Sequence, residues 1–181
     1  MSLYIAFLRA INVGGHTVRM DSLRQLFESF GFTQVETFIA SGNVVFETPA
    51  QERRALEQSI QDQLHAVLGY AVAAFIRTPA ELAEIASRSP FPPSELEAAM
   101  ALNVAFLAEP LDAAAQQKLM TLRTAIDNFH VQQCEVYWLC RKRQSESTFS
   151  NVVFEKVVGR QTTLRGINTV RKLAAKYAAV V

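Results

Sequence analysis

The sequence predicts an α+β protein with two subdomains, and three observations lead to this class. Half of the 181 residues are hydrophobic, enough for one substantial core or two small fused ones. Up to residue 77, the spacing of the apolar residues predicts elements in the order strand, helix, strand, strand, helix, strand. From residue 78 a similar order returns without its last strand. We therefore expect a ferredoxin-like split βαβ subdomain at 1–77, packed against a second, smaller α+β subdomain at 78–181.

The first half begins with a strand at 3–9 that is apolar at both odd and even positions, as in strands covered on both faces. A helix follows, because apolar residues recur at the i, i+3, i+4, i+7 spacing and Gly31 supplies a stop. These apolar residues are Leu23, Leu26, Phe27 and Phe30. The other expected elements are a hairpin of strands 35–40 and 44–47, a helix at 50–68 closed by Gly69, and a strand at 70–77.

The second half opens on two capping boxes, Thr78 with Glu81 and Ser94 with Glu97, each of which predicts a helix start. The proline-rich segment 90–93 between them cannot be helical. The remaining expected elements are a strand at 102–107, a helix capped by Asp112, strands at 129–131 and 135–141, a helix at 149–158, and a helix at 168–178 with Asn168 as its N-cap.

The expected topology has a consequence for function. It places the third strand between the first and second, so the loop at 12–15 and the turn at 41–43 leave neighbouring strands at the same end of the sheet. We therefore expect the two segments to meet. The sheet face that the helices of the first half leave bare also needs a cover, and the second half is the material available for it.

The segment from Arg9 to Arg19 is the least generic part of the chain. Adjacent glycines between a strand and a helix allow positive φ, and successive N–H groups can then form an anion-binding nest. Each segment also has a purely structural interpretation. The loop after the first strand can be an ordinary tight connection, and the segment 41–43 can be a plain hairpin turn. The segment around Arg165 and Asn168 can be a capped surface helix. The residues predicted to bind a ligand are Arg9, Asn12, Gly14, Gly15, Arg19, Ser41, Gly42, Asn43, Arg165 and Asn168.

Charge is distributed unevenly along the chain. Residues 1–140 carry nine Lys or Arg and fifteen Asp or Glu, whereas residues 141–181 carry nine basic residues and two acidic ones. The basic segment either docks onto the acidic part of its own chain or meets an external anion.

Several classes of protein are not expected. The sequence has no apolar run of about 18 residues and no signal peptide, so we expect a cytoplasmic protein that does not enter a membrane. Cys134 and Cys140 lie in one expected strand, too far apart to bridge, and no His pair suggests a metal. No Walker loop, dinucleotide fingerprint or nucleophile elbow is present, and we expect no cofactor.

The chain carries a set of short motifs: Leu8-Arg9, INVGG at 11–15, VRM at 18–20, Leu23, Gly31-Phe32, SGNVVF at 41–46, Pro90-Phe91, Ser150-Asn151, Glu155-Lys156, Gly159, and Arg165 with Asn168, Thr169, Val170, Lys172 and Leu173. Together they resemble a bacterial family of domains of unknown function, number 1697. The resemblance covers essentially the whole chain and implies a cytoplasmic α+β protein with a ferredoxin-like first part, but no activity. The chain departs from the family pattern at Ala10, where Gly is usual, and at 163–169, where Thr-Thr-Arg-Asn-Trp-Asn-Thr is typical.

The motif residues are mostly polar or Gly and lie in expected loops, where binding sites concentrate. We therefore expect an anionic small molecule, such as a nucleotide or a phosphorylated metabolite, as the partner. One alternative is a nucleic-acid-binding protein that uses the basic C-terminal part, and another is an enzyme of unrecognised type. The sequence does not indicate an oligomeric state.

Overall fold

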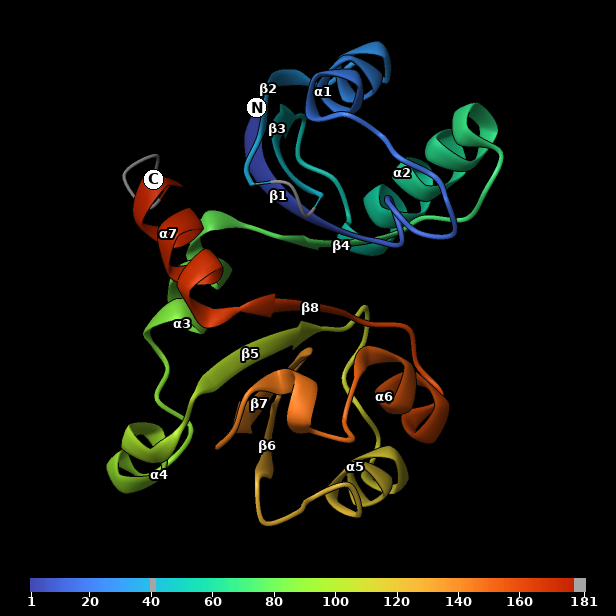
Figure 1. Ribbon diagram of the computed structural model, residues 1–181. Helices are drawn as coiled ribbons and strands as arrows, with labels where there is room; N and C mark the ends of the chain where they lie inside the picture. The colour runs from blue at the N-terminus through green and yellow to red at the C-terminus, as the bar shows by residue number, and fades with distance from the viewer. Residues whose placement is uncertain (40–41, 178–181) are drawn as a thin grey trace. The chain divides into compact units, whose positions relative to one another are not determined.

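A computed structural model describes residues 1–39 and 42–177 (Figure 1). The chain divides into two compact units. Unit 1 contains Met1–Leu82 together with Tyr177, and unit 2 contains Ala83–Lys176. Each unit is built on its own four-stranded sheet. That the two halves of the chain pack into one body stays a prediction.

Unit 1 has the expected order of elements, in which all strand neighbours are antiparallel. Its sheet order is β2-β3-β1-β4, so β3 lies between β1 and β2, which run parallel to each other. This confirms the ferredoxin-like split βαβ topology. The elements are β1 (Ser2–Arg9), α1 (Met20–Ser29), β2 (Thr33–Thr37), β3 (Asn43–Thr48), α2 (Arg53–Leu68) and β4 (Ala73–Arg77).

The core of unit 1 lies between the sheet and its two helices, which cover one face of the sheet (Figure 1). Alternate residues of β1 face this core, as the period of a strand requires. Both helices contribute residues at helical spacing, and Gly69 ends α2 in the left-handed conformation with φ of 78°. The buried core residues of these elements are Tyr4, Ala6 and Leu8 of β1, Leu23 and Phe27 of α1, and Leu56, Ile60 and Leu64 of α2.

Two short helices follow unit 1's sheet. The capping box opens α3 (Pro79–Ser87): Glu81 Oε2 accepts from Thr78 N at 2.8 Å, and Thr78 Oγ1 accepts from Glu81 N at 3.3 Å. The proline-rich segment then separates α3 from α4 (Pro93–Ala98). The first start agrees with the sequence pattern. The second does not, because α4 begins at Pro93, with Pro92 at its N-cap and no side-chain cap, so Ser94 and Glu97 form no capping box. Proline fits the first position of a helix, where its missing N–H is not needed.

Unit 2 repeats the topology of unit 1, with sheet order β6-β7-β5-β8 and every described pairing antiparallel. The expectation that its last strand is missing was wrong, because Thr163–Gly166 pairs with β5 as β8. Unit 2 is therefore not smaller by a strand. Its elements are β5 (Ala101–Phe106), α5 (Ala113–Met120), β6 (Asp127–Gln132), β7 (Glu135–Cys140), the short 3₁₀ helix η1 (Gln144–Glu146), α6 (Asn151–Val158), β8 (Thr163–Gly166) and α7 (Ile167–Tyr177).

The core of unit 2 surrounds a buried carboxylate, that of Asp127. Its two oxygens accept from three neutral donors: Trp138 Nε1 at 2.8 Å, Ser147 Oγ at 2.8 Å and Thr124 Oγ1 at 3.1 Å. Burial, with Asp127 beside it, raises the pKa of the Cys140 thiol. A buried carboxylate needs such donors, so Asp127 ties the segment after β7 to the sheet.

Candidate functional site

The loop that leaves β1 contains a tight turn at the two glycines. His16 N donates to Val13 O at 3.0 Å, and the residues between them, Gly14 and Gly15, have φ of 61° and 85°. Two positive φ angles in succession are typical of a type I′ turn, which strongly favours Gly. The N–H of His16 is therefore used inside the turn.

Two contacts hold the rest of this loop in place. Asn12 Oδ1 accepts a hydrogen bond from Val18 N at 2.6 Å. The His16 ring stacks on the Tyr70 ring, with 4.0 Å between centroids, and Tyr70 Oη donates to Ile11 O at 2.8 Å. Burial raises the pKa of the Tyr70 hydroxyl. Asn12 and His16 thus shape the loop that leads into α1.

The turn between β2 and β3 contacts the end of β1 and the first part of this loop, at Leu8 and Ile11. A contact of this turn with residues 12–15 stays a prediction. Gly42 O accepts from Leu8 N at 2.9 Å, and Gly42 has φ of 76°. A Cβ on Gly42 would lie 2.9 Å from Ile11 Cγ2 and 3.2 Å from Leu8 Cβ. A glycine is required here both by the backbone conformation and by the close approach. Ser41 lies outside the described residues.

Asn43 has a role inside the hairpin. Its side chain is buried, and Nδ2 donates to Phe38 O at 2.8 Å. Phe38 N in turn donates to Asn43 O at 2.9 Å. Asn43 therefore stabilises the turn, and its side chain does not point out of the turn toward a ligand.

The two arginines that flank the loop lie on different sides of the sheet. Leu8 belongs to the core under the helices, and successive side chains of a strand point to opposite faces, so Arg9 belongs to the other face. Arg19 precedes α1 on the helix side, as its N-terminal flanking residue. The structure therefore does not bring Arg9 and Arg19 together.

Arg19 instead lines a groove on the helix side of unit 1, with a volume of about 500 Å³. Its lining is mixed, and its apolar members, which also pack against the core of unit 1, are called its floor below. Among the described residues, the side chains of Arg19, Ser22 and Gln25 make no hydrogen bond or ion pair. The lining residues are Thr17, Val18 and Arg19 before α1, Ser22, Gln25, Leu26 and Ser29 of α1, and Leu68 at the end of α2.

Apart from Arg19 and its neighbour Val18, the sequence did not point to the groove residues. Ser22, Gln25 and Ser29 are spaced as one strip of a helix, but a polar strip is also what any solvated helix face shows. Leu68 reaches the groove only because α2 packs beside α1 on the same sheet face. That arrangement is a tertiary feature without a local signal.

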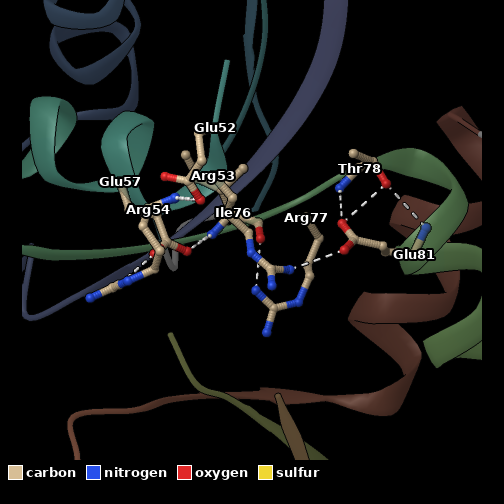
Figure 2. Close-up of polar contacts among 8 residues, drawn as sticks. All are labelled: Glu52, Arg53, Arg54, Glu57, Ile76, Arg77, Thr78 and Glu81. Carbon is tan, nitrogen blue, oxygen red and sulfur yellow. Dashed lines mark hydrogen bonds and ion pairs between the residues drawn. The ribbon is translucent and has the colours of Figure 1, made fainter. Parts of the chain in front are cut away.

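A second cavity in unit 1, of about 260 Å³, lies where α2 and α3 begin. Its polar groups bind one another: Arg53 Nη1 lies 3.0 Å from Glu81 Oε1, and the other oxygen of Glu81 accepts from Thr78 (Figure 2). Glu52 accepts from the backbone N–H groups of Arg54 and Ala55, which lowers the pKa of its carboxyl group. This cavity is a structural network, so the groove is the better candidate.

Arg165 and Asn168 belong to unit 2. Arg165, on β8, is buried, and its Nη1 donates to Thr163 Oγ1 at 2.7 Å and to Leu164 O at 2.9 Å. Burial lowers the pKa of its guanidinium to about 10. Asn168 is not an N-cap as expected, because α7 begins one residue earlier, at Ile167. A strand that runs directly into the helix displaces the cap.

Motif residues of α6 hold β8 in place. Asn151 Nδ2 donates to Thr162 O at 3.0 Å, and Glu155 Oε1 accepts from Thr162 N at 3.0 Å. The two side chains thus bind both backbone groups of the residue before β8. Their role is to position that strand, and through it Arg165.

Several basic residues of the segment 141–181 pair within unit 2. Arg141 Nη2 lies 2.6 Å from Glu95 Oε2, and Arg160 Nη2 lies 3.7 Å from Asp112 Oδ2. Together with the buried Arg165, these contacts support docking within the chain for part of the positive charge.

In 1–39 and 42–177, no group of three or more His, Cys, Asp or Glu side chains is placed to hold a metal ion. No helix in the same ranges has the length and apolar character needed to cross a membrane.

Comparisons with known proteins give a family and a fold. No curated protein matches the chain. A solved structure, that of a conserved bacterial protein from Streptococcus pneumoniae, is similar with a TM-score of 0.71 over 96% of this chain and 97% of that one, at 19% identity. This likeness supports the fold alone. The model of a family of proteins of unknown function, DUF1697, matches residues 1–137, and the chain belongs to this family.

Proposed function

We propose that the protein binds an anionic small molecule, a nucleotide or a phosphorylated metabolite, in the groove beside α1. The observation that carries the proposal is the open groove of about 500 Å³ that has Arg19 in its wall. Its volume falls in the range of small-molecule sites, about 300–1,000 Å³. No acidic side chain lines it, so the arginine sets its charge.

The motif residues fit this proposal as supports of the groove. Asn12 holds Val18 by a hydrogen bond of 2.6 Å, and Val18 and Arg19 line the groove. The glycine turn at 14–15 and the packing of Gly42 on Ile11 set the path of the same loop. Most of these residues act on the site through the loop, whereas Arg19 is expected to touch the ligand.

Thermal denaturation in the presence of anions tests the proposal. The full chain is heated with a mononucleotide, a sugar phosphate, inorganic phosphate or chloride at constant ionic strength. We expect at least one phosphorylated compound to raise the midpoint, because a ligand at about 100 times its Kd stabilises by about 2.7 kcal/mol.

Two single-charge variants locate the effect. Arg19→Gln removes the groove cation and is expected to reduce the affinity roughly tenfold, since hydrogen bonds to charged groups contribute roughly 1.5–3 kcal/mol before solvent screening. Arg24→Gln removes the same charge from α1 outside the groove, where Arg24 pairs with Glu28 at 2.6 Å. Equal effects of both variants, or no shift with any anion, would contradict the proposal.

A further inference from the structure

Residues along α1 line the groove. Ser22, Gln25, Leu26 and Ser29 follow the i, i+3, i+4, i+7 spacing of one helix face. Seven residues of an α-helix span about 10 Å at about 1.5 Å per residue. Arg19 stands at the beginning of this strip, so a ligand that fills the groove has one end beside the cation.

The positive charge of the groove lies at one end, whereas apolar residues are found along it. At the first end, the guanidinium of Arg19 adjoins the start of α1, where no side chain caps the helix and the positive end of its dipole lies. The floor is formed by Val18, Leu26 and Leu68, whose other sides pack against the core of unit 1. A purely ionic ligand would leave this apolar floor in water.

From this arrangement we infer the class of ligand: an elongated molecule with one anionic group at Arg19 and an apolar or aromatic body over Leu26 and Leu68. The inference rests on the proposed anion site. It limits the ligand to one anionic group, which a carboxylate can supply as well as a phosphate, and adds an apolar body. One cation matches one carboxylate or phosphate monoester better than a polyphosphate, whose further charges would find no partner among the lining residues. The floor contributes by removing apolar surface from water.

Matched compounds separate the contributions of the anionic group and of the apolar body to the binding affinity. Calorimetric titrations of the full chain use adenosine monophosphate, adenosine and inorganic phosphate for an aromatic body, and octanoate and butyrate for an aliphatic one. We expect the complete molecule of at least one series to bind at least tenfold more tightly than its fragments. Whichever of adenosine monophosphate and octanoate binds more tightly identifies the kind of body.

A pair of neighbouring variants tests the floor. Leu68→Ser removes floor surface, whereas Val67→Ser changes the adjacent residue, which is 57% exposed and does not line the groove. We expect Leu68→Ser to lower the affinity for adenosine monophosphate or octanoate, whichever binds more tightly, about tenfold. The affinity for inorganic phosphate should not change, and Val67→Ser should have no such effect. The thermal midpoint without ligand reports whether Leu68→Ser stays folded. Shifts of the amide resonances of Val18 and Leu26 during the titration report whether the compound binds in the groove.

The outcomes distinguish this inference from the proposed function. If inorganic phosphate binds as tightly as adenosine monophosphate and Arg19→Gln weakens both, the anion site stands and the apolar body is refuted. If no compound with an anionic group binds, both are refuted. If adenosine binds as tightly as its monophosphate, the nucleotide form of both is refuted. Shifts confined to residues outside the groove would also overturn the inference.

Discussion

Asn12 and Val18 are joined by a hydrogen bond of 2.6 Å from the backbone N–H of Val18 to Oδ1 of Asn12. The bond spans the glycine turn and ends at the groove wall. Residues 16–19 have no regular secondary structure, so few other backbone bonds fix their position. With the stack of His16 on Tyr70, this bond explains how a polar motif residue after β1 sets the shape of a groove that it does not line.

Replacing Asn12 with Ala is therefore expected to loosen the groove wall. The loss of one exposed hydrogen bond should cost about 1 kcal/mol of unfolding free energy. Amide hydrogen exchange of Val18 should accelerate severalfold, while that of Leu64 in the middle of α2 stays near its native rate. Asn12→Asp keeps an acceptor at the same position and should retain most of the protection; unchanged Val18 exchange in Asn12→Ala would contradict this role.

Gly42 and Gly14 offer a matched pair of substitutions at positive φ. Gly42→Ala places a Cβ 2.9 Å from Ile11 Cγ2, whereas a Cβ on Gly14 meets nothing within 4 Å. The left-handed conformation costs about 1–2 kcal/mol for a non-glycine residue in either variant. Overpacking adds about 1–3 kcal/mol at Gly42 alone. Urea denaturation should thus find Gly42→Ala the less stable variant, and equal losses would show that the two loops are not in close contact.

The sequence predicted the elements whose signals are local. The two-sided apolar pattern of β1, the stop at Gly69 and the box at Thr78 all follow from residues near one another. The strand β8 was missed because its four residues include Arg165 and end in a glycine, so neither apolar alternation nor length indicates a strand. It exists because β5 offers an unpaired edge.

The candidate site shows the same limit. Arg19 and the glycine turn could be read from the sequence, and the contact of the turn at Gly42 with the loop followed from topology. The groove required knowing that Leu68 and α1 flank the same space, which depends on how two helices pack. That Arg9 faces away from Arg19 follows from strand parity once the register of β1 is known.

Glu57 is expected to be the most sensitive polar residue of unit 1. Its carboxylate is fully buried, Oε1 accepts from Ile76 N on the edge strand β4 at 2.9 Å, and Oε2 lies 2.7 Å from Arg54 Nη1 (Figure 2). Glu57→Ala leaves the Ile76 N–H without its acceptor and opens a cavity, so unfolding free energy should fall by about 2–4 kcal/mol. Glu28→Ala breaks an exposed pair with Arg24 and should cost less than about 0.5 kcal/mol. Equal losses in chemical denaturation would refute the structural role of Glu57.

Tyr137 should make stability depend on pH in the alkaline range. It is buried on β7, Oη donates to Ile85 O at 2.9 Å, and burial raises its pKa from 10.0 to about 12. The folded protein thus favours the neutral phenol. The contribution of Tyr137 to the free energy of unfolding is complete below pH 10. It is lost as the pH rises toward 12, because the phenol of the unfolded chain then releases its proton first. Two pKa units correspond to roughly 2–3 kcal/mol.

Titration of Arg165 should raise stability over the same alkaline pH range, which opposes the effect of Tyr137. The effect of Tyr137 is therefore measured as the difference between wild type and a Tyr137 variant. Burial lowers the pKa of Arg165 to about 10, and the cost of burying its charge is relieved as the pH rises above that value. Tyr137→Phe removes only the phenol. At pH 8 it should be less stable than wild type by about 1 kcal/mol, because Ile85 O loses its donor. Between pH 10 and 12 the difference in unfolding free energy, measured by urea denaturation at each pH, should shrink and then reverse; a constant difference would mean that Tyr137 titrates alike in both states.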